Sequence, residues 1–215
     1  NMVTRGSDVE DEHFDLSHGT PIVTSGANVI RDRAVAYLIL EKPWLRLEIG
    51  RNEIEWGPSG YDGLAISRHM PPADIFRLSS HFKKWTLTST HAFLSSSLGP
   101  KYLAAHRLDW TIKPGFYLGA SESVIYANRH VEFAYLNPLM LYHVAEHHLG
   151  DKDNNSLSID LTAFLVPGIK VYGEFFIDDM TSTRSWTSYF GNKFALLLGG
   201  HFVDPMGLAN TDVHI

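Results

Sequence analysis

Residues 44–67, WLRLEIGRNEIEWGPSGYDGLAIS, join a strand-like segment to a glycine-rich loop. Apolar residues stand at every second position from 45 to 49, with charged residues between them, and this alternation predicts a β-strand with one apolar and one polar face. Arg51 is assigned to the polar face, because Gly50 can shift the register. The loop places several glycines around Trp56, a composition typical of tight turns that display aromatic surface.

The same alternation runs through most of the chain and predicts one all-β unit. Further strands are expected at 34–40, 75–80, 84–94, 106–113, 116–121, 157–165 and 169–178, followed by an apolar hairpin over 186–203. Pro-Gly pairs at 114–115 and 167–168 predict two-residue turns between antiparallel neighbours. Residues 1–28 are expected to form a polar lead-in loop, and residues 29–215 the strands and loops of a single domain.

One segment departs from the strand pattern. Asn137 and Pro138 predict a short helix over 138–149, with the asparagine as N-cap, the proline at the first helical position and a glycine at the end. In a barrel, this helix would lie in a loop or in the lumen. His143 and His147 are four residues apart on it and would present two imidazoles to zinc. The HExxH order is absent, so exposed loop histidines are favoured and no metal site is predicted.

The composition excludes several classes of function. The chain has 18 Lys and Arg against 24 Asp and Glu, a formal charge of −6, and no basic stripe, which argues against a nucleic-acid partner. It has no cysteine and therefore no thiol chemistry, and it lacks a phosphate loop, a nucleophile elbow and a dinucleotide fingerprint, so no cofactor is predicted. No apolar run is long enough for a transmembrane helix, whereas the alternating segments are also what a transmembrane β-barrel shows.

Short motifs in a fixed order resemble outer-membrane β-barrels of the capsule assembly Wzi type. They are Arg51, WGPSG at 56–60, GLAIS at 63–67, HRLDW at 106–110, GASESVIY at 119–126, YLNPLMLYH at 135–143, DNNSLSIDL at 153–161 and YGEFFIDD at 172–179. The resemblance covers roughly residues 45–215. It implies an antiparallel up-and-down transmembrane β-barrel in the bacterial outer membrane, of which this chain is one part.

The resemblance also implies a non-enzymatic, lectin-like role in binding exported polysaccharide and attaching it to the cell surface. The implied partners are surface polysaccharide, outer-membrane lipid and other envelope proteins. The residues expected to organise the lumen or to contact sugar are Arg51, Trp56, Arg107, Glu122, Asp160, Glu174, Asp178 and Asp179. These positions rest on where the motifs lie and on side-chain chemistry.

Two other classes of protein remain open. A soluble or periplasmic carbohydrate-active enzyme would use two of the carboxylates, but Glu174 and Asp178 on one strand face are about 13 Å apart, which fits neither usual glycosidase geometry. Structural pairing of the carboxylates with Arg51, Arg107 or Lys170 is therefore favoured. A porin-like channel would have the same polar lumen face, and a soluble β-sandwich would give the same alternation as a solvated face.

Overall fold

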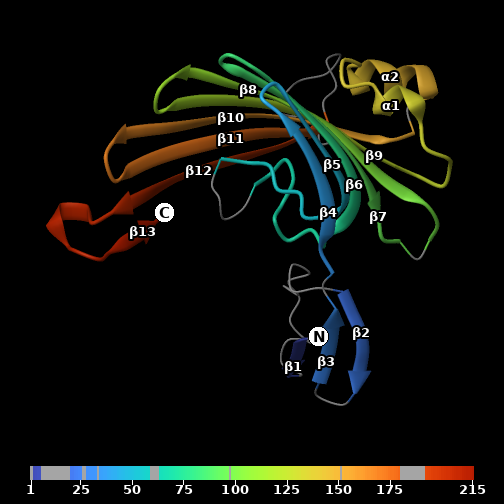
Figure 1. Cartoon of the computed structure of the whole chain (residues 1–215), viewed down its shortest axis with the longest axis horizontal. Coiled ribbons are helices and arrows are strands. Elements are labelled where there is room, and N and C mark those ends of the chain that lie inside the picture. Colours follow the sequence, from blue (N-terminus) through green and yellow to red (C-terminus); the bar gives the residue numbers. More distant parts are fainter. Residues whose placement is uncertain are drawn as a thin grey trace.

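The computed structural model describes residues 2–5, 20–25, 28–32, 34–58, 63–96, 98–150, 152–179 and 192–215. One large antiparallel sheet dominates these residues (Figure 1). Its ten strands are β4 (Ala36–Lys42), β5 (Leu45–Asn52), β6 (Ala73–Phe82), β7 (Trp85–Leu94), β8 (Lys101–Lys113), β9 (Phe116–Ala127), β10 (Asn154–Val166), β11 (Ile169–Asp179), β12 (Lys193–Val203) and β13 (Asp212–His214). Two helices, α1 (Phe133–Leu136) and α2 (Tyr142–Leu149), and a 3-10 turn, η3 (Pro205–Gly207), complete the ordered elements of this part.

Each strand of this sheet pairs with its neighbour in the sequence, so the order runs from β4 to β13 without a crossover. The predicted all-β, antiparallel, up-and-down architecture is confirmed. The sheet is open, because the two edge strands, β4 and β13, do not pair with each other in the described structure. Within the described residues, no helix is long and apolar enough to span a membrane.

A separate three-stranded sheet precedes the large one. It consists of β1 (Met2–Arg5), β2 (Thr20–Ser25) and β3 (Asn28–Asp32), with β3 in the centre. Two of these strands lie inside the predicted lead-in loop, so that segment contains regular structure where a loop was expected. Its polar composition and its glycines gave no period-two apolar signal.

The large sheet has one polar and one apolar face, because side chains alternate along each strand. We call the face that carries Glu48, Arg77 and Thr90 the polar face, since these residues are directly opposite one another on β5, β6 and β7. The other face, called the apolar face, carries the neighbouring row that begins with Leu47 and Leu78. The alternation predicted for the opening strand is therefore confirmed for positions 45–49.

Arg51 is an exception, and its assignment to the polar face is wrong. The β5–β6 register continues without a shift, and Arg51 lies opposite Asp74 on the apolar face, where Nε donates to Asp74 Oδ1 at 3.0 Å. Gly50 serves close approach rather than a bulge, because a β-carbon there would lie 2.4 Å from the carbonyl oxygen of Ala36 on the paired strand.

The connections between strands differ at the two ends of the sheet. At one end, β4–β5, β6–β7, β8–β9 and β10–β11 are joined by two-residue turns, which include the predicted Pro-Gly turns. At the other end the connections are long and span 53–72, 95–100, 128–153 and 180–192. The connection 204–211 between β12 and β13, which contains η3, lies at the same end as the two-residue turns.

The helical segment lies against the apolar face, on the side of the sheet opposite to the 53–72 connection (Figure 1). Helix α2 starts at Tyr142, four residues later than predicted, and ends as expected at Gly150, which has a left-handed φ of 95°. The side chain of Asn137 accepts from the amide of Leu139 instead of capping α2. The expected helix exists, but it starts later and does not lie on the polar face that would line a lumen.

Candidate functional site

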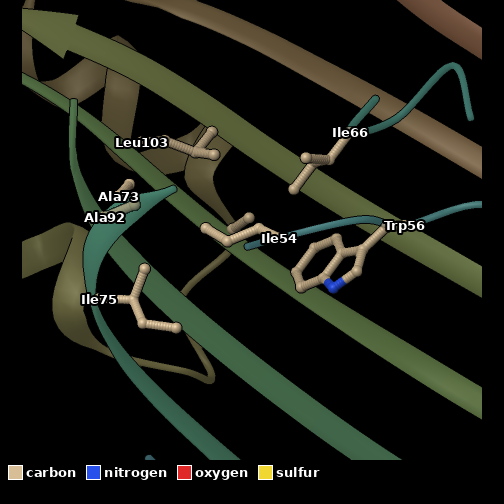
Figure 2. Close-up of a cluster of buried hydrophobic side chains, with 8 residues drawn as sticks. Ile54, Trp56, Ile66, Ala73, Ile75, Ala92 and Leu103 are labelled. Carbon is tan, nitrogen blue, oxygen red and sulfur yellow. The ribbon is translucent and has the colours of Figure 1, made fainter. Parts of the chain in front are cut away.

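The glycine-rich connection folds over the polar face and covers part of it. Ile54 and Trp56 on one arm and Ile66 on the other pack against β6, β7 and β8, and Figure 2 shows these side chains converging on Ile75 and Leu103. The two arms are joined by an antiparallel bridge, in which the Trp56 amide donates to the Ile66 carbonyl at 3.0 Å. The connection therefore forms a small core of its own on the sheet.

Trp56 belongs to this core and is only 8% exposed. The expectation that the loop displays the indole as a flat aromatic surface is wrong, because the loop turns back onto the sheet and buries the ring. An indole in this position stabilises the connection by apolar burial. It offers little face for stacking against a sugar.

Glu174 of β11 binds the second arm of the 53–72 connection, which contains Leu64, Ala65 and Ile66. Its carboxylate accepts the amide N–H groups of Leu64 at 2.9 Å and Ala65 at 2.8 Å, as well as the Ser158 hydroxyl at 2.8 Å. The Glu174 side chain is 1% exposed, so these three donors replace water around the charge. Lys170, also on β11, donates from Nζ to the carbonyl of Pro58 at 2.6 Å. The residues of the connection thus reach across to strands about 110 positions away in sequence.

Arg107 and Asp160 form a second polar cluster on the same face. Two guanidinium nitrogens donate to the two Asp160 oxygens at 2.5 and 3.0 Å, while Nε donates to Asp109 at 2.8 Å. Gly119 lies on β9, between Arg107 of β8 and Asp160 of β10, and a β-carbon there would come 2.0 Å from Arg107 Nη2. The glycine leaves space for the bidentate ion pair to cross β9.

Glu48 organises a third cluster beside an open groove. It accepts from Asn52 at 2.6 Å and from Arg77 at 3.2 Å, and Arg46 lies 3.7 Å away. The groove next to it has a volume of about 610 Å³. Its lining is polar and comprises Glu41, Arg46, Glu53, Glu55, Arg77, Ser79, His81, Thr86 and Thr88, together with an edge of Trp56. Hydroxyl, carboxylate and guanidinium groups of this kind can hydrogen-bond a polyhydroxylated ligand.

The carboxylates predicted for the polar face are brought together unevenly. Asp160 and Glu174 are directly opposite on β10 and β11, but each is buried and engaged by the donors described above. Asp178 shares their face and contacts Asn154 at 3.3 Å and Lys193 at 3.5 Å. Asp179 is the last residue of β11 and is paired in register with Lys193; its side chain lies outside the described residues. These contacts suit a structural network.

Glu122, like Arg51, lies on the apolar face, so its expected place in a polar lumen network is wrong. Its two oxygens accept the amides of Tyr142 at 2.9 Å and His143 at 2.7 Å, and the Asn155 side-chain amide at 3.2 Å. His106 Nε2 is 3.0 Å from it. Glu122 thus caps the first turn of α2 from the sheet, which explains why the helix starts without a cap from its own sequence.

Tyrosines fill the space between the helical segment and the sheet. Tyr135 and Tyr142 pack with Tyr126 of β9, and Tyr142 is fully buried. Burial raises the pKa of Tyr142 above its ordinary value. Burial likewise raises the pKa of Tyr135, and its hydroxyl donates to Asp153 at 2.7 Å. Both phenols therefore stay protonated and act as donors in the packing.

Among the described residues, the histidines of α2 have no further ligand group that would complete a metal site. The rings of His143 and His147 are 4.4 Å apart in an edge-to-face arrangement. No group of three or more histidine, aspartate or glutamate ligands occurs in the part of the chain that the structure describes.

Several residues of these clusters were missed by the sequence interpretation, namely Asn52, Arg77, His106 and Asn155. Arg77 is directly opposite Glu48 on the next strand, but the long connection 53–72 between β5 and β6 leaves no turn signal in the sequence from which this register could be read. The contacts of His106 with the helical segment have no local signal. In comparisons with known proteins, no family model and no curated protein matches the chain.

Proposed function

We propose that this chain forms part of an outer-membrane β-barrel of the capsule assembly type, which binds surface polysaccharide and helps to attach it to the cell. The observation that carries the proposal is the two-faced meander, with a hydrogen-bonded polar face and an exposed apolar face. In a barrel the polar face would line the lumen and the apolar face would contact lipid.

The apolar face supports the membrane assignment through its exposure. Leu198 is 71% exposed, Leu196 65% and Ile159 57%. Other large side chains exposed on this face are Leu38, Leu40, Ile49, Phe76, Phe93, Leu108, Leu157, Leu161, Phe175 and Phe194. A contiguous exposed apolar surface of this extent marks a membrane or a partner interface.

The strand ends support the same assignment. Outer-membrane barrels have short turns at the periplasmic end and long loops at the cell surface, and this sheet has a similar asymmetry except at the 204–211 connection. Near the short turns, Trp85 and Trp110 stack with ring centroids 4.9 Å apart on the apolar face. Tryptophans near the strand ends are typical of the aromatic girdle that outer-membrane barrels place at the membrane–water interface.

The polysaccharide role rests on the resemblance and on the groove beside Glu48. The groove opens on the polar face and offers both donors and acceptors. The 53–72 connection lies on that face and would narrow the lumen, which favours binding over free conduction. An enzymatic role finds less support, since Asp160 and Glu174 are committed to Arg107 and to the connection.

The membrane part of the proposal is tested by extraction and gel mobility. We expect the chain to leave native membranes only with detergent and to migrate differently on gels before and after boiling, as a closed barrel does. A chain that remains a compact monomer in buffer without detergent would contradict this part.

The binding part is tested on the groove with a panel of isolated bacterial polysaccharides. Arg46→Ala and Glu55→Ala each remove a charged group from the groove lining, and we expect each to weaken binding about tenfold, because a hydrogen bond to a charged group contributes about 1.5–3 kcal/mol. Arg51→Ala is the matched control, since Arg51 lies on the other face. Equal binding by all three variants and the parent would rule out the groove as the sugar site.

A further inference from the structure

We propose that the hollow between α2 and the apolar face holds one acyl chain of a membrane lipid. The hollow has a volume of about 460 Å³, which lies within the range of roughly 300–1,000 Å³ typical of small-molecule sites. Its floor is formed by Leu87, Leu108, Ala120, Leu157, Ile159 and Phe175 of five consecutive strands. Its wall is formed by Leu141, His143 and Val144 at the start of α2.

The carboxylate at this site is already matched within the protein, whereas Nδ1 of His106, which also lines the hollow, has no hydrogen-bond partner in the described structure. Among the described residues that line the hollow, Glu122 is the only acidic one, and its carboxylate is engaged by His106, two α2 amides and Asn155. A charged ligand would therefore lose its hydration without gaining an opposite charge. An uncharged hydrocarbon chain loses nothing in the same place, and its contacts with the aliphatic lining are favourable.

The hollow is continuous with the surface proposed to face lipid. Leu108, Ile159 and Phe175 line it and are also exposed on the apolar face, at 41%, 57% and 43%. On the helix side, Leu141 is 62% exposed and Val144 45% exposed, so the floor and the wall of the hollow both present apolar groups at its opening. A lipid next to the sheet could insert one acyl chain beneath α2 without crossing a polar barrier. The inference rests on the proposed membrane location, and its test separates the two.

The test uses photolabelling of the full chain in phosphatidylethanolamine and phosphatidylglycerol vesicles. A small fraction of the phospholipid carries a diazirine in its acyl chain, and labelled peptides are located by mass spectrometry. We expect label on residues 141–149 as well as on residues 194–198 of the open apolar face. Ala120→Phe fills the hollow with a phenyl ring, so label on 141–149 should fall about fivefold while label on 194–198 stays constant.

Ala36→Phe is the matched control, because Ala36 is exposed on the same face but lies on edge strand β4, outside the hollow. It should leave the label on 141–149 unchanged. Label on 194–198 without label on 141–149, or label on 141–149 that Ala120→Phe does not reduce, would overturn the acyl-chain site and leave the membrane location standing. Absence of label from 194–198 would overturn the membrane location itself. Cross-links between two chains through 141–144, formed with a bifunctional cross-linker in place of the lipid probe, would assign the hollow to a second copy and overturn the lipid proposal.

Discussion

Replacing Arg107 by alanine is expected to lower the free energy of unfolding by about 4 kcal/mol, because it leaves the buried Asp160 carboxylate without its partner. The Arg107 side chain is 12% exposed and that of Asp160 is 4% exposed, so water cannot readily take the place of the guanidinium. Asp109 loses its Nε donor in the same step. The measurement is urea unfolding in detergent micelles, followed by tryptophan fluorescence.

The chain offers a matched control for this experiment. Arg51 and Asp74 also form a bidentate ion pair, but this pair joins neighbouring strands and its side chains are 40% and 59% exposed. Arg51→Ala should cost less than about 0.5 kcal/mol, since exposed ion pairs contribute little. Adding Asp160→Asn to Arg107→Ala should recover part of the loss by removing the buried charge. Equal unfolding midpoints for Arg107→Ala and Arg51→Ala would contradict the role assigned to the buried pair.

Glu122→Ala is expected to release the helical segment from the sheet, at a cost of about 3 kcal/mol, because the substitution removes the acceptor of two α2 amides and of Asn155 and also separates His106 from its carboxylate. The effect should be local. Hydrogen exchange should become fast for the amides of residues 142–149, whereas β8 and β9 should remain protected.

Two variants control for this result. Glu122→Gln keeps one acceptor oxygen and the side-chain volume, so it should retain part of the protection of α2. Ser123→Ala changes the adjacent residue on the polar face, where its hydroxyl bonds Ser156 at 2.7 Å, and should cost about 1 kcal/mol without releasing α2. Unchanged exchange of residues 142–149 in Glu122→Ala would show that apolar packing alone holds the helical segment.

The strands and short turns could be predicted from the sequence because their signals are local. The period-two pattern of 157–165 and the Pro-Gly pair at 167–168 each report on residues that are close in the chain, and both are confirmed by β10 and β11. The polar character of one face follows from the same pattern. Even there, a single glycine misled the assignment of Arg51, because its role in close strand approach looks like a bulge in the sequence.

The parts that could not be predicted depend on contacts between distant segments. Trp56 is buried because the connection folds back onto β6–β8, and the amides of Leu64 and Ala65 bind a carboxylate about 110 residues away. Likewise, the start of α2 is determined by Glu122 on the sheet and not by Asn137 in its own sequence. Local propensity contains no information on these partners.

The uninterrupted meander bears on how the protein can assemble. Because every strand from β5 to β13 pairs with the strand before it in the chain, each new strand can add to the growing sheet as soon as it forms. No strand of the large sheet needs a partner that is distant in the sequence. The hydrogen bonds between the 53–72 connection and Glu174 of β11, however, can form only after the six strands β6 to β11 are in place. We therefore expect the sheet to form first and the 53–72 connection to bind to β11 later. Until the last strand is added, the most recently added strand has an unpaired edge to which the next strand can bind.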